Sequence, residues 1–250
     1  MGNINDNYFD GSYKDVWKAL IPEILTVKET EFLLQYFNLQ RGQRVLDLMC
    51  GYGRHTLALA RNGLDVTAVD NLESYIDELQ RTIDLESLPA RGYQADILTY
   101  TPGNGQYDLA LCMGNSLNFF NKEESIRILS NIKEALQPAG HLVINTWSLA
   151  EIAYRQFVEK SEGQTAGIKI VSDSRFCRSP SRIESTTLME LQDGTIETKP
   201  AVDYIFSINE MEDMLSAAGL SLMEIYSIPG RKKFTLGDPR AYLVAQKIPR

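Results

Sequence analysis

The sequence is poor in the residues that build disulfide frameworks and metal centres. Its three cysteines, Cys50, Cys112 and Cys177, are widely spaced, and no Cys-x-x-Cys pair occurs. It has only two histidines, His55 and His141, and no histidine-rich pattern that is typical of zinc sites. We therefore expect neither a disulfide scaffold nor a bound metal ion.

Long apolar segments are also missing. Residues 1–6 are mostly polar, and no apolar core of signal-peptide length follows the first methionine. No apolar run elsewhere approaches the roughly 20 residues that a membrane-spanning helix needs. We therefore expect no membrane partner and predict a cytoplasmic protein.

Basic residues are outnumbered in this chain. The sequence has 25 Lys and Arg against 33 Asp and Glu, for a formal net charge of −8. This balance repels polyanions at long range, so we expect no nucleic-acid partner. The one short basic cluster, residues 231–233, is interpreted as a solvated turn. Hydrophobic residues make up 44% of the 250 residues, which predicts one domain over residues 1–250. The oligomeric state stays open, with a homodimer as one option.

Short apolar segments alternate with helical patterns in the first two thirds of the chain. The apolar segments predicted as strands are 44–49, 66–70, 92–97, 107–113 and 141–145. The amphipathic segments predicted as helices are 55–62, 72–83 and 121–136. Such alternation builds a parallel sheet with helices on both faces, and strands so apolar are buried on both sides. The predicted fold class is therefore α/β.

The flanking regions have other patterns. Residues 1–40 are predicted to be helical, with capping-box spacing at residues 26–29. Residues 155–206 are rich in β-branched residues with partial alternation, and Asp193-Gly194 is a hairpin-turn signal, which predicts an antiparallel insertion. Beyond it, a capping box at residues 207–210 starts another helix, and two further strands follow before the chain ends.

The most informative segment is the glycine-rich turn after the first predicted strand. Gly51 and Gly53 let the backbone approach a ligand, and a helix begins directly after them. A dinucleotide-binding turn would have a third glycine where Thr56 stands, and Asp47 would repel a pyrophosphate. A ligand with an ammonium group and no phosphate fits this turn, and S-adenosylmethionine (SAM) is such a ligand.

Two further acids follow the next predicted strands. Asp70 stands where a carboxylate can accept hydrogen bonds from both ribose hydroxyls, and Asp96 is placed to contact an adenine amino group. Three acids at successive strand ends, together with the glycine turn, argue against a purely structural turn. Neighbouring residues complete the predicted cofactor-binding set: Met49, Asn71, Ile97 and Met113.

The motifs resemble those of class I SAM-dependent methyltransferases. The run VLDLMCGYGRHTLALARNGLDVTAVD (residues 45–70) is similar to the cofactor motifs of that family. The runs YDLALCMGNSLNFF (107–120) and LQPAGHLVIN (136–145) are similar to the motifs of its fourth and fifth strands. The resemblance implies a Rossmann-like, mostly parallel sheet of seven strands, with SAM as the cofactor.

A narrower resemblance links two segments to glycine N-methyltransferases. The run DNYFDG (6–11), followed by Val16-Trp17, implies that Tyr8 and Trp17 contact the cofactor and that residues 1–40 form a helical lid. Trp17 is equally well explained as a core residue of an amphipathic helix. The run CMGNS (112–116) implies that Asn115 contacts the methyl acceptor.

Departures from that group bear on the acceptor. Its next histidine is replaced by Phe119, and its arginine-containing segment is replaced by residues 147–150. A glycine carboxylate would then lack its cationic partner. The resemblance therefore implies a small-molecule N-methyltransferase with an acceptor other than glycine.

Methyl transfer from SAM is an in-line displacement, in which the protein chiefly aligns the reactants and excludes water. A neutral amine needs no base for bond formation, whereas a hydroxyl acceptor benefits from one. His55 is near enough to be considered as that base, although a helix histidine is more often structural. The predicted acceptor contacts are Asn115, Trp147, Tyr52 and Tyr204, with Arg175 and Phe176 of the insertion as further contributors.

Several other functions stay open at this point. An NAD-dependent oxidoreductase would need a turn that accepts pyrophosphate. A SAM-binding protein without catalysis would lack an acceptor pocket. O-methylation and protein methylation remain alternatives to N-methylation of a small molecule.

Overall fold

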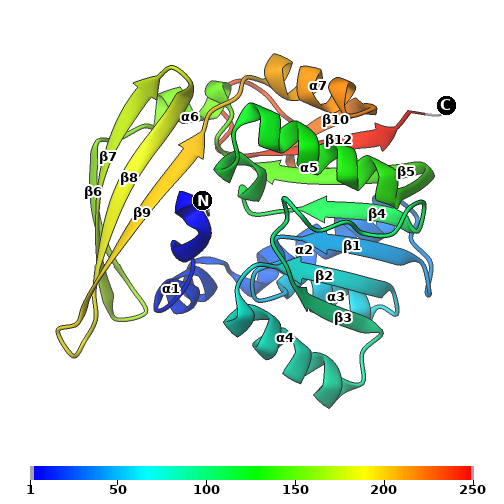
Figure 1. Cartoon of the computed structure of the whole chain (residues 1–250), viewed down its shortest axis with the longest axis horizontal. Coiled ribbons are helices and arrows are strands. Elements are labelled where there is room, and N and C mark those ends of the chain that lie inside the picture. The colour runs from blue at the N-terminus through cyan, green and yellow to red at the C-terminus, as the bar shows by residue number, and fades with distance from the viewer. Residues whose placement is uncertain (1–2, 249–250) are drawn as a thin grey trace.

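The computed structural model describes residues 3–248, which form a central mixed sheet and a second, antiparallel sheet beside it (Figure 1). The central sheet has the order β11-β10-β12-β5-β4-β1-β2-β3. Its strands are β1 (Arg44–Leu48), β2 (Asp65–Asp70), β3 (Ala90–Gln94), β4 (Tyr107–Cys112), β5 (Leu136–Thr146), β10 (Leu220–Ile228), β11 (Lys232–Lys233) and β12 (Ala241–Lys247).

The pairing of these strands confirms the predicted α/β class. Strands β1 to β5 pair in parallel, whereas β12 runs antiparallel to both β5 and β10. Seven of the eight strands correspond to the expected seven-stranded sheet. The eighth, β11, lies in the basic cluster that was interpreted as a turn, and it pairs with β10 through only two residues.

Helices cover both faces of the central sheet. On one face lie α2 (Glu23–Tyr36), α3 (Arg54–Arg61) and α4 (Glu73–Glu86), and on the other lie α5 (Lys122–Ala135) and α7 (Ile208–Ala217). Successive strand residues point to opposite faces, so Val45 belongs to the core cluster that contains residues of α2 and α3, while Leu46 belongs to the cluster that contains residues of α5 and α7. Among the described residues, no helix combines the length and the apolar character that crossing a membrane would require.

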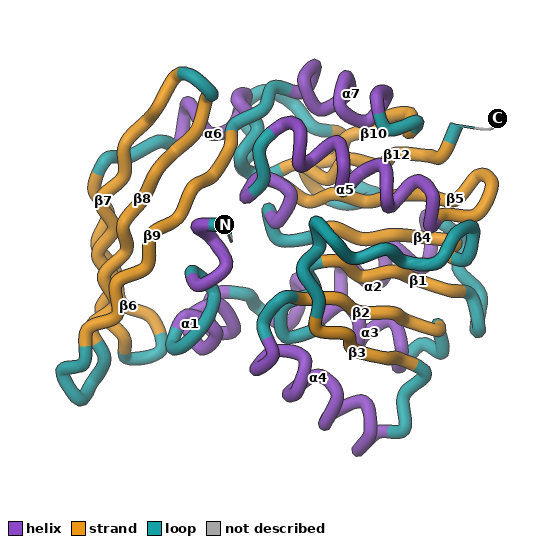
Figure 2. Tube along the Cα trace, viewed as in Figure 1, coloured by secondary structure: helices purple, strands orange, loops and turns teal. Residues whose placement is uncertain are grey.

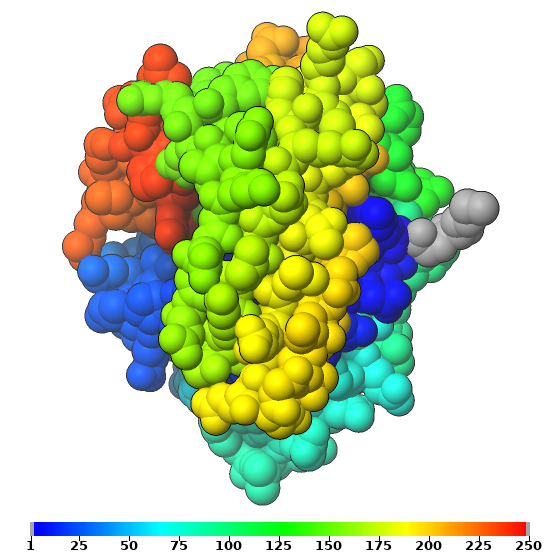
Figure 3. All heavy atoms as spheres, turned by 90° about the vertical axis from the view of Figure 1, so that its left-hand side faces the viewer, coloured from blue at the N-terminus to red at the C-terminus, as the bar shows by residue number. Residues whose placement is uncertain are grey.

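The second sheet confirms the antiparallel insertion. Its strands follow the order β6-β7-β8-β9, with bounds β6 (Lys160–Thr165), β7 (Ile168–Arg178), β8 (Ser181–Glu190) and β9 (Ile196–Tyr204). Helix α6 (Ala150–Gln156) leads into it. Figure 2 shows this sheet as long hairpins, and Figure 3 views its outer face. Gly194 adopts a left-handed φ of 83° in the turn between β8 and β9, as the Asp-Gly signal predicts.

The N-terminal region divides into two parts. The first part, η1 (Ile4–Asn7) and α1 (Tyr13–Leu20), lies between the two sheets (Figure 1). The Asn5 side chain is tied there to Val202 of β9, since it donates to the Val202 carbonyl oxygen at 3.0 Å and accepts from the Val202 amide at 2.8 Å. The second part, α2, packs on the central sheet, so of residues 1–40 only those before α2 lie between the two sheets.

Some element boundaries differ from the expectation. Helix α2 begins at Glu23 after Pro22, not at the predicted capping box, because proline lacks a backbone N–H and is tolerated at the start of a helix. Strand β3 ends at Gln94, which leaves Asp96 in the following loop. Strand β5 begins at Leu136, and its register against β4 shifts before His141. The Pro-Ala-Gly segment is thus an irregularity inside the strand.

Glu29 was part of the predicted capping box, but it is a buried residue in the middle of α2 with 1% of its surface exposed. Its carboxylate accepts from Arg54 Nη1 at 2.5 Å and Tyr242 Oη at 2.7 Å, and it lies 3.0 Å from His55 Nε2. Burial alone would raise the pKa of Glu29, but His55 and Arg54 outweigh it and lower this pKa to about 2. The cluster therefore joins α2, α3 and β12.

We expect Glu29→Gln to destabilise the protein by about 3 kcal/mol at pH 7, because it removes one partner of a buried ion pair. A depressed carboxylate pKa stabilises the folded state above about pH 4.5, and this contribution is lost as the pH falls toward 2. The difference between wild type and variant in urea unfolding should therefore shrink by about 2 kcal/mol between pH 7 and pH 3. Glu86→Gln, at an exposed pair with Arg61, is the control and should leave the unfolding free energy nearly unchanged. An equal deficit for Glu29→Gln at both pH values would contradict this account.

Candidate functional site

A pocket lies at the carboxyl ends of the parallel strands, beneath η1 and α1. It is lined by residues that follow β1, β2, β3 and β4, by the N-terminal segment and by Trp147 after β5. Its empty space of about 1330 Å³ includes a part open to solvent.

The turn after β1 forms the floor of this pocket. Its backbone is left-handed at Met49, Gly51 and Gly53, with φ values of 55°, 57° and 80°. A Cβ atom added at Gly53 would lie 2.4 Å from Leu79 of α4, so glycine is required there for packing. A Cβ added at Gly51 would meet no atom within 4 Å, because this position faces open space. The two glycines thus serve different purposes.

Asp47 lies on β1 and is almost fully buried, with 1% of its surface exposed. The Thr56 hydroxyl of α3 donates to Asp47 Oδ2 at 2.6 Å. This contact explains why threonine replaces the third glycine of a dinucleotide motif, since its side chain anchors the acid. Burial raises the pKa of Asp47, with His55, Thr56 and Arg54 acting in the opposite direction. A cationic ligand group beside this carboxylate would offset the cost of its burial.

Asp70 ends β2 and faces the same pocket. Its carboxylate accepts hydrogen bonds from the backbone amides of Gly51 at 2.8 Å and Leu72 at 3.1 Å. Burial raises the pKa of Asp70 despite these bonds, and the nearby charge of Asp47 adds to the effect. Two buried carboxylates in one pocket favour a ligand that brings a positive charge and hydroxyl donors.

The structure brings most of the predicted cofactor residues together. Nine of the eleven line the pocket: Trp17, Asp47, Met49, Gly51, Asp70, Asn71, Asp96, Ile97 and Met113. The other two, Gly53 and Tyr8, do not line it. Gly53 is the N-cap of α3, and the ring of Tyr8 lies 4.8 Å from that of Tyr13. Asn71 also donates to Asp6 at 3.2 Å, which connects the N-terminal segment to the end of β2.

Five aromatic rings form a connected wall of the pocket. Tyr13 stacks on Trp17 with ring centroids 6.3 Å apart, and Trp17 lies 6.0 Å from Trp147. Phe9 contacts Phe119 at 4.9 Å. All five rings line the pocket, and they come from the N-terminal segment and from the loops after β4 and β5. Such a wall excludes water and binds cations through its ring faces.

The predicted acceptor residues separate into two groups. Trp147 and Tyr52 line the pocket, whereas Asn115 and Tyr204 do not. The buried Asn115 Oδ1 accepts from Thr146 Oγ1 and from the amides of Trp147 and Ser148 at 2.9–3.1 Å, so this side chain fixes the loop after β5.

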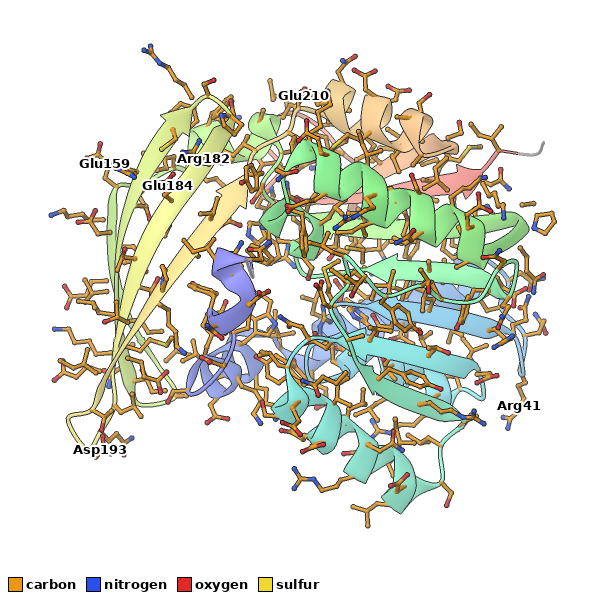
Figure 4. The ribbon with its side chains drawn as sticks, in the orientation of Figure 1. Arg41, Glu159, Arg182, Glu184, Asp193 and Glu210 are labelled. Atoms are coloured by element: carbon orange, nitrogen blue, oxygen red, sulfur yellow. The ribbon has the colours of Figure 1, made fainter. Side chains whose placement is uncertain are left out.

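The contributors expected from the insertion lie elsewhere. Arg175 pairs with Glu184 and is largely exposed, and Phe176 packs against Tyr154. Figure 4 labels Glu184 and Arg182 on β8 of the second sheet, away from the central sheet. Tyr204 stacks near Phe206 and packs against the main core. His55, considered as a base, lines the pocket but has Glu29 as its buried partner.

Several pocket residues were not singled out from the sequence. Phe9 and Tyr13 stand in an aromatic-rich N-terminal run, which was a usable signal. Arg54 directly follows the glycine turn, so its position also pointed to the pocket. Tyr75 lies within the predicted helix 72–83, where no local pattern marks it as a pocket residue. Its hydroxyl donates to the Phe9 carbonyl oxygen at 2.7 Å, a contact that depends on the tertiary fold.

Comparison with known proteins agrees with this architecture. The family profile of the methyltransferase domain matches residues 45–140, which contain the glycine turn and the three strand-end acids. The glycine/sarcosine N-methyltransferase of Halorhodospira halochloris is 28% identical over 152 residues, covering 56% of this chain and 53% of that protein. The chain thus spans about half the length of several curated relatives that it matches.

Solved structures share the fold over nearly the whole chain. A SAM-dependent methyltransferase from Clostridium acetobutylicum superposes with a TM-score of 0.80 at 15% identity, covering 95% of this chain and 96% of that one. SAM-bound CalS10, an amino pentose methyltransferase from Micromonospora echinaspora, superposes with a TM-score of 0.69 at 17% identity, covering 95% and 97%. These comparisons show that residues 45–140 match the methyltransferase domain and that the chain has the fold of SAM-dependent methyltransferases of known structure.

Proposed function

We propose that this enzyme transfers the methyl group of SAM to the nitrogen of a small amine. The observation that carries the proposal is the mixed lining of the pocket. Buried carboxylates Asp47 and Asp70 line it together with a set of aromatic rings. The carboxylates suit a zwitterionic nucleoside, and the rings suit an acceptor that arrives as a cation.

The cofactor side fits SAM by its chemistry. Asp70 would accept hydrogen bonds from the ribose hydroxyls, and Asp96, in the loop after β3, would contact the adenine amino group. Asp47 would favour the ammonium group of the methionine part, and the open face of Gly51 would let the backbone approach it. Trp17, Met49, Asn71, Ile97 and Met113 would complete the lining around these polar contacts.

The acceptor side supports an amine over other acceptors. Tyr13, Trp17 and Trp147 line the pocket, and aromatic ring faces attract ammonium groups by up to about 2 kcal/mol when water is excluded. The relatives named above include proteins described as methyltransferases of glycine, sarcosine and an amino pentose. A peptide or nucleic-acid acceptor would need a larger opening and, for nucleic acid, a basic surface.

The protein mainly positions the reactants. When bound, SAM supplies an electrophilic methyl group on a positively charged sulfur. The strand-end acids would hold the donor at the floor of the pocket, and the aromatic wall would confine the amine, which would favour in-line attack of the nitrogen on the methyl carbon. The rings also exclude water that would compete with the amine.

Asp70→Ala should abolish binding of S-adenosylhomocysteine (SAH) and leave the fold intact. Each hydrogen bond to a charged group contributes about 1.5–3 kcal/mol, so the loss of two predicts at least about 100-fold weaker binding. Calorimetry measures the affinity, and circular dichroism checks the fold. Asp65→Ala, at the exposed start of the same strand, is the matched control and should bind SAH like the wild type. Tight binding by Asp70→Ala would show that the ribose site lies elsewhere.

Gly51→Ala and Gly42→Ala form a second pair. Both glycines have a left-handed φ and free space around an added Cβ, so both variants should lose about 1–2 kcal/mol of stability. Only Gly51 lies in the pocket, so only Gly51→Ala should bind SAH at least about tenfold more weakly, an effect of about 1.4 kcal/mol. Equal SAH affinity of the two variants would contradict the placement of the donor against the turn.

A third test concerns the reaction itself. Wild-type enzyme with SAM is incubated with small amines, with their hydroxyl counterparts and with a lysine-containing peptide, and release of SAH is measured. We expect release with amines alone and, in parallel calorimetry, binding of SAH without binding of NADH. Release with hydroxyl compounds or with the peptide would instead indicate an O- or protein methyltransferase. SAH binding without any turnover would indicate a non-catalytic SAM-binding protein.

A further inference from the structure

Arg54 is the first residue of α3, directly after the glycine turn, and none of the contacts described above for SAM uses its guanidinium. It lines the pocket, and its side chain is 12% exposed. Of the described residues that line the pocket, Arg54 alone is a lysine or arginine, whereas four of the lining residues are aspartates. The pocket therefore combines several acids with one permanent positive charge, which suits a ligand that carries both signs of charge.

The hydrogen bonds of Arg54 leave one edge of the guanidinium unused. A guanidinium carries N–H donors on Nη1, Nη2 and Nε, with two of them on Nη1. Nη1 donates to Thr26 Oγ1 at 3.0 Å and to Glu29 Oε2 at 2.5 Å, which occupies both of its donors. No hydrogen bond within residues 3–248 uses Nε or Nη2 of this side chain. The Nε–Nη2 edge therefore remains for a ligand in the pocket.

The used edge of Arg54 is held by a buried cluster. Glu29 accepts from Tyr242 Oη at 2.7 Å and lies 3.0 Å from His55 Nε2, so the carboxylate that holds Nη1 has partners on two other elements. A largely buried charged group with free donors costs free energy unless an acceptor is supplied. A carboxylate supplies one best, because its two oxygens accept parallel hydrogen bonds from Nε and Nη2.

The surroundings of Arg54 indicate which carboxylate this is. The Thr56 hydroxyl, from the same turn of α3, donates to Asp47 Oδ2 at 2.6 Å, so Arg54 and Asp47 flank one helix start, and both line the pocket. The N-cap of α3 is Gly53, which offers no side chain to the first amides, and a helix N-terminus favours a negative group. A carboxylate beside Arg54 and an ammonium group beside Asp47 match the α-amino acid end of a ligand.

We propose that Arg54 binds the α-carboxylate of the methyl donor through its Nε–Nη2 edge and thereby selects donors with an intact amino acid end. This role rests on the proposed function, which places SAM against the glycine turn. Nη1 keeps Glu29 and Thr26 as its partners when the donor is bound. Asp47 and Arg54 then match the two charges at one end of the donor, and Asp70 accepts from its ribose at the other.

The test compares SAH with decarboxylated SAH, which keeps the adenosine, the sulfur and the ammonium group but lacks the carboxylate. Calorimetry gives, for each protein, the dissociation constant of decarboxylated SAH divided by that of SAH. We expect Arg54→Gln to lower this ratio at least about tenfold relative to wild type, because it removes a charge-assisted pair of hydrogen bonds. Arg54→Lys keeps the charge without the planar fork and should lower the ratio at least about threefold.

Tyr242→Phe is the matched control. It removes another hydrogen bond of Glu29, but Tyr242 does not line the pocket, so this variant should keep the wild-type ratio. The control separates loss of the ligand contact from loosening of the buried cluster. Circular dichroism checks the fold of each variant, and Arg54→Lys, which keeps a cation beside Glu29, decides the matter if Arg54→Gln does not fold.

The other outcomes overturn the proposal. A wild-type ratio in Arg54→Gln would show a purely structural role, because such a role weakens both ligands alike. A wild-type ratio in Arg54→Lys would overturn the assignment to the Nε–Nη2 edge, and an equal fall in Tyr242→Phe would trace the effect to the Glu29 cluster. Wild-type enzyme that bound neither ligand would instead contradict the proposed function itself, a result distinct from the others.

Discussion

The hydrogen bond from the Gly51 amide to the Asp70 carboxylate joins the turn after β1 to the end of β2, and the pocket depends on it. The Thr56 hydroxyl holds Asp47 in a similar way on the other side of the turn. Both acids are buried, and burial raises their pKa values. A ligand that is cationic at one end and rich in hydroxyl donors, as the proposed SAM is, would offset this cost of burial.

The N-terminal segment, attached to the second sheet, covers the pocket at the carboxyl ends of the parallel strands. Parallel strands end at one edge, where loops alone would leave a bound ligand in contact with water. Here η1 and α1 cover that edge and are fastened by polar contacts to β9 and to α4, for example between Ser12 and Glu197 and between Lys14 and Glu78. These polar contacts are partly exposed, whereas the helices of the central sheet are held by a large apolar core. We therefore expect η1 and α1 to be attached less firmly than the helices of the central sheet.

Much of the architecture was predictable because it follows from local patterns. The alternation of apolar strands and amphipathic helices between residues 44 and 145 predicted the parallel sheet, and the Asp193-Gly194 signal placed the hairpin between β8 and β9. The capping box at Ser207 formed as expected, since its hydrogen bonds lie within one helical turn. The similar spacing at Thr26 did not mark a helix start, because Pro22 lies at that boundary and Glu29 has partners on α3 and β12.

The sequence by itself determined the α/β class, the glycine turn and the strand-end acids, because spacing along one chain segment decides all three. Only the tertiary structure decided which of the predicted acceptor residues line the pocket. On β9 the sequence pointed to Tyr204, but its ring packs against the main core beside Phe206 and does not line the pocket. Asn115 is likewise buried, and it bonds Asp203, 88 residues later in the chain, through the packing of the second sheet against the central one. No local pattern encodes a contact between segments so far apart, because it is set by how the two sheets pack.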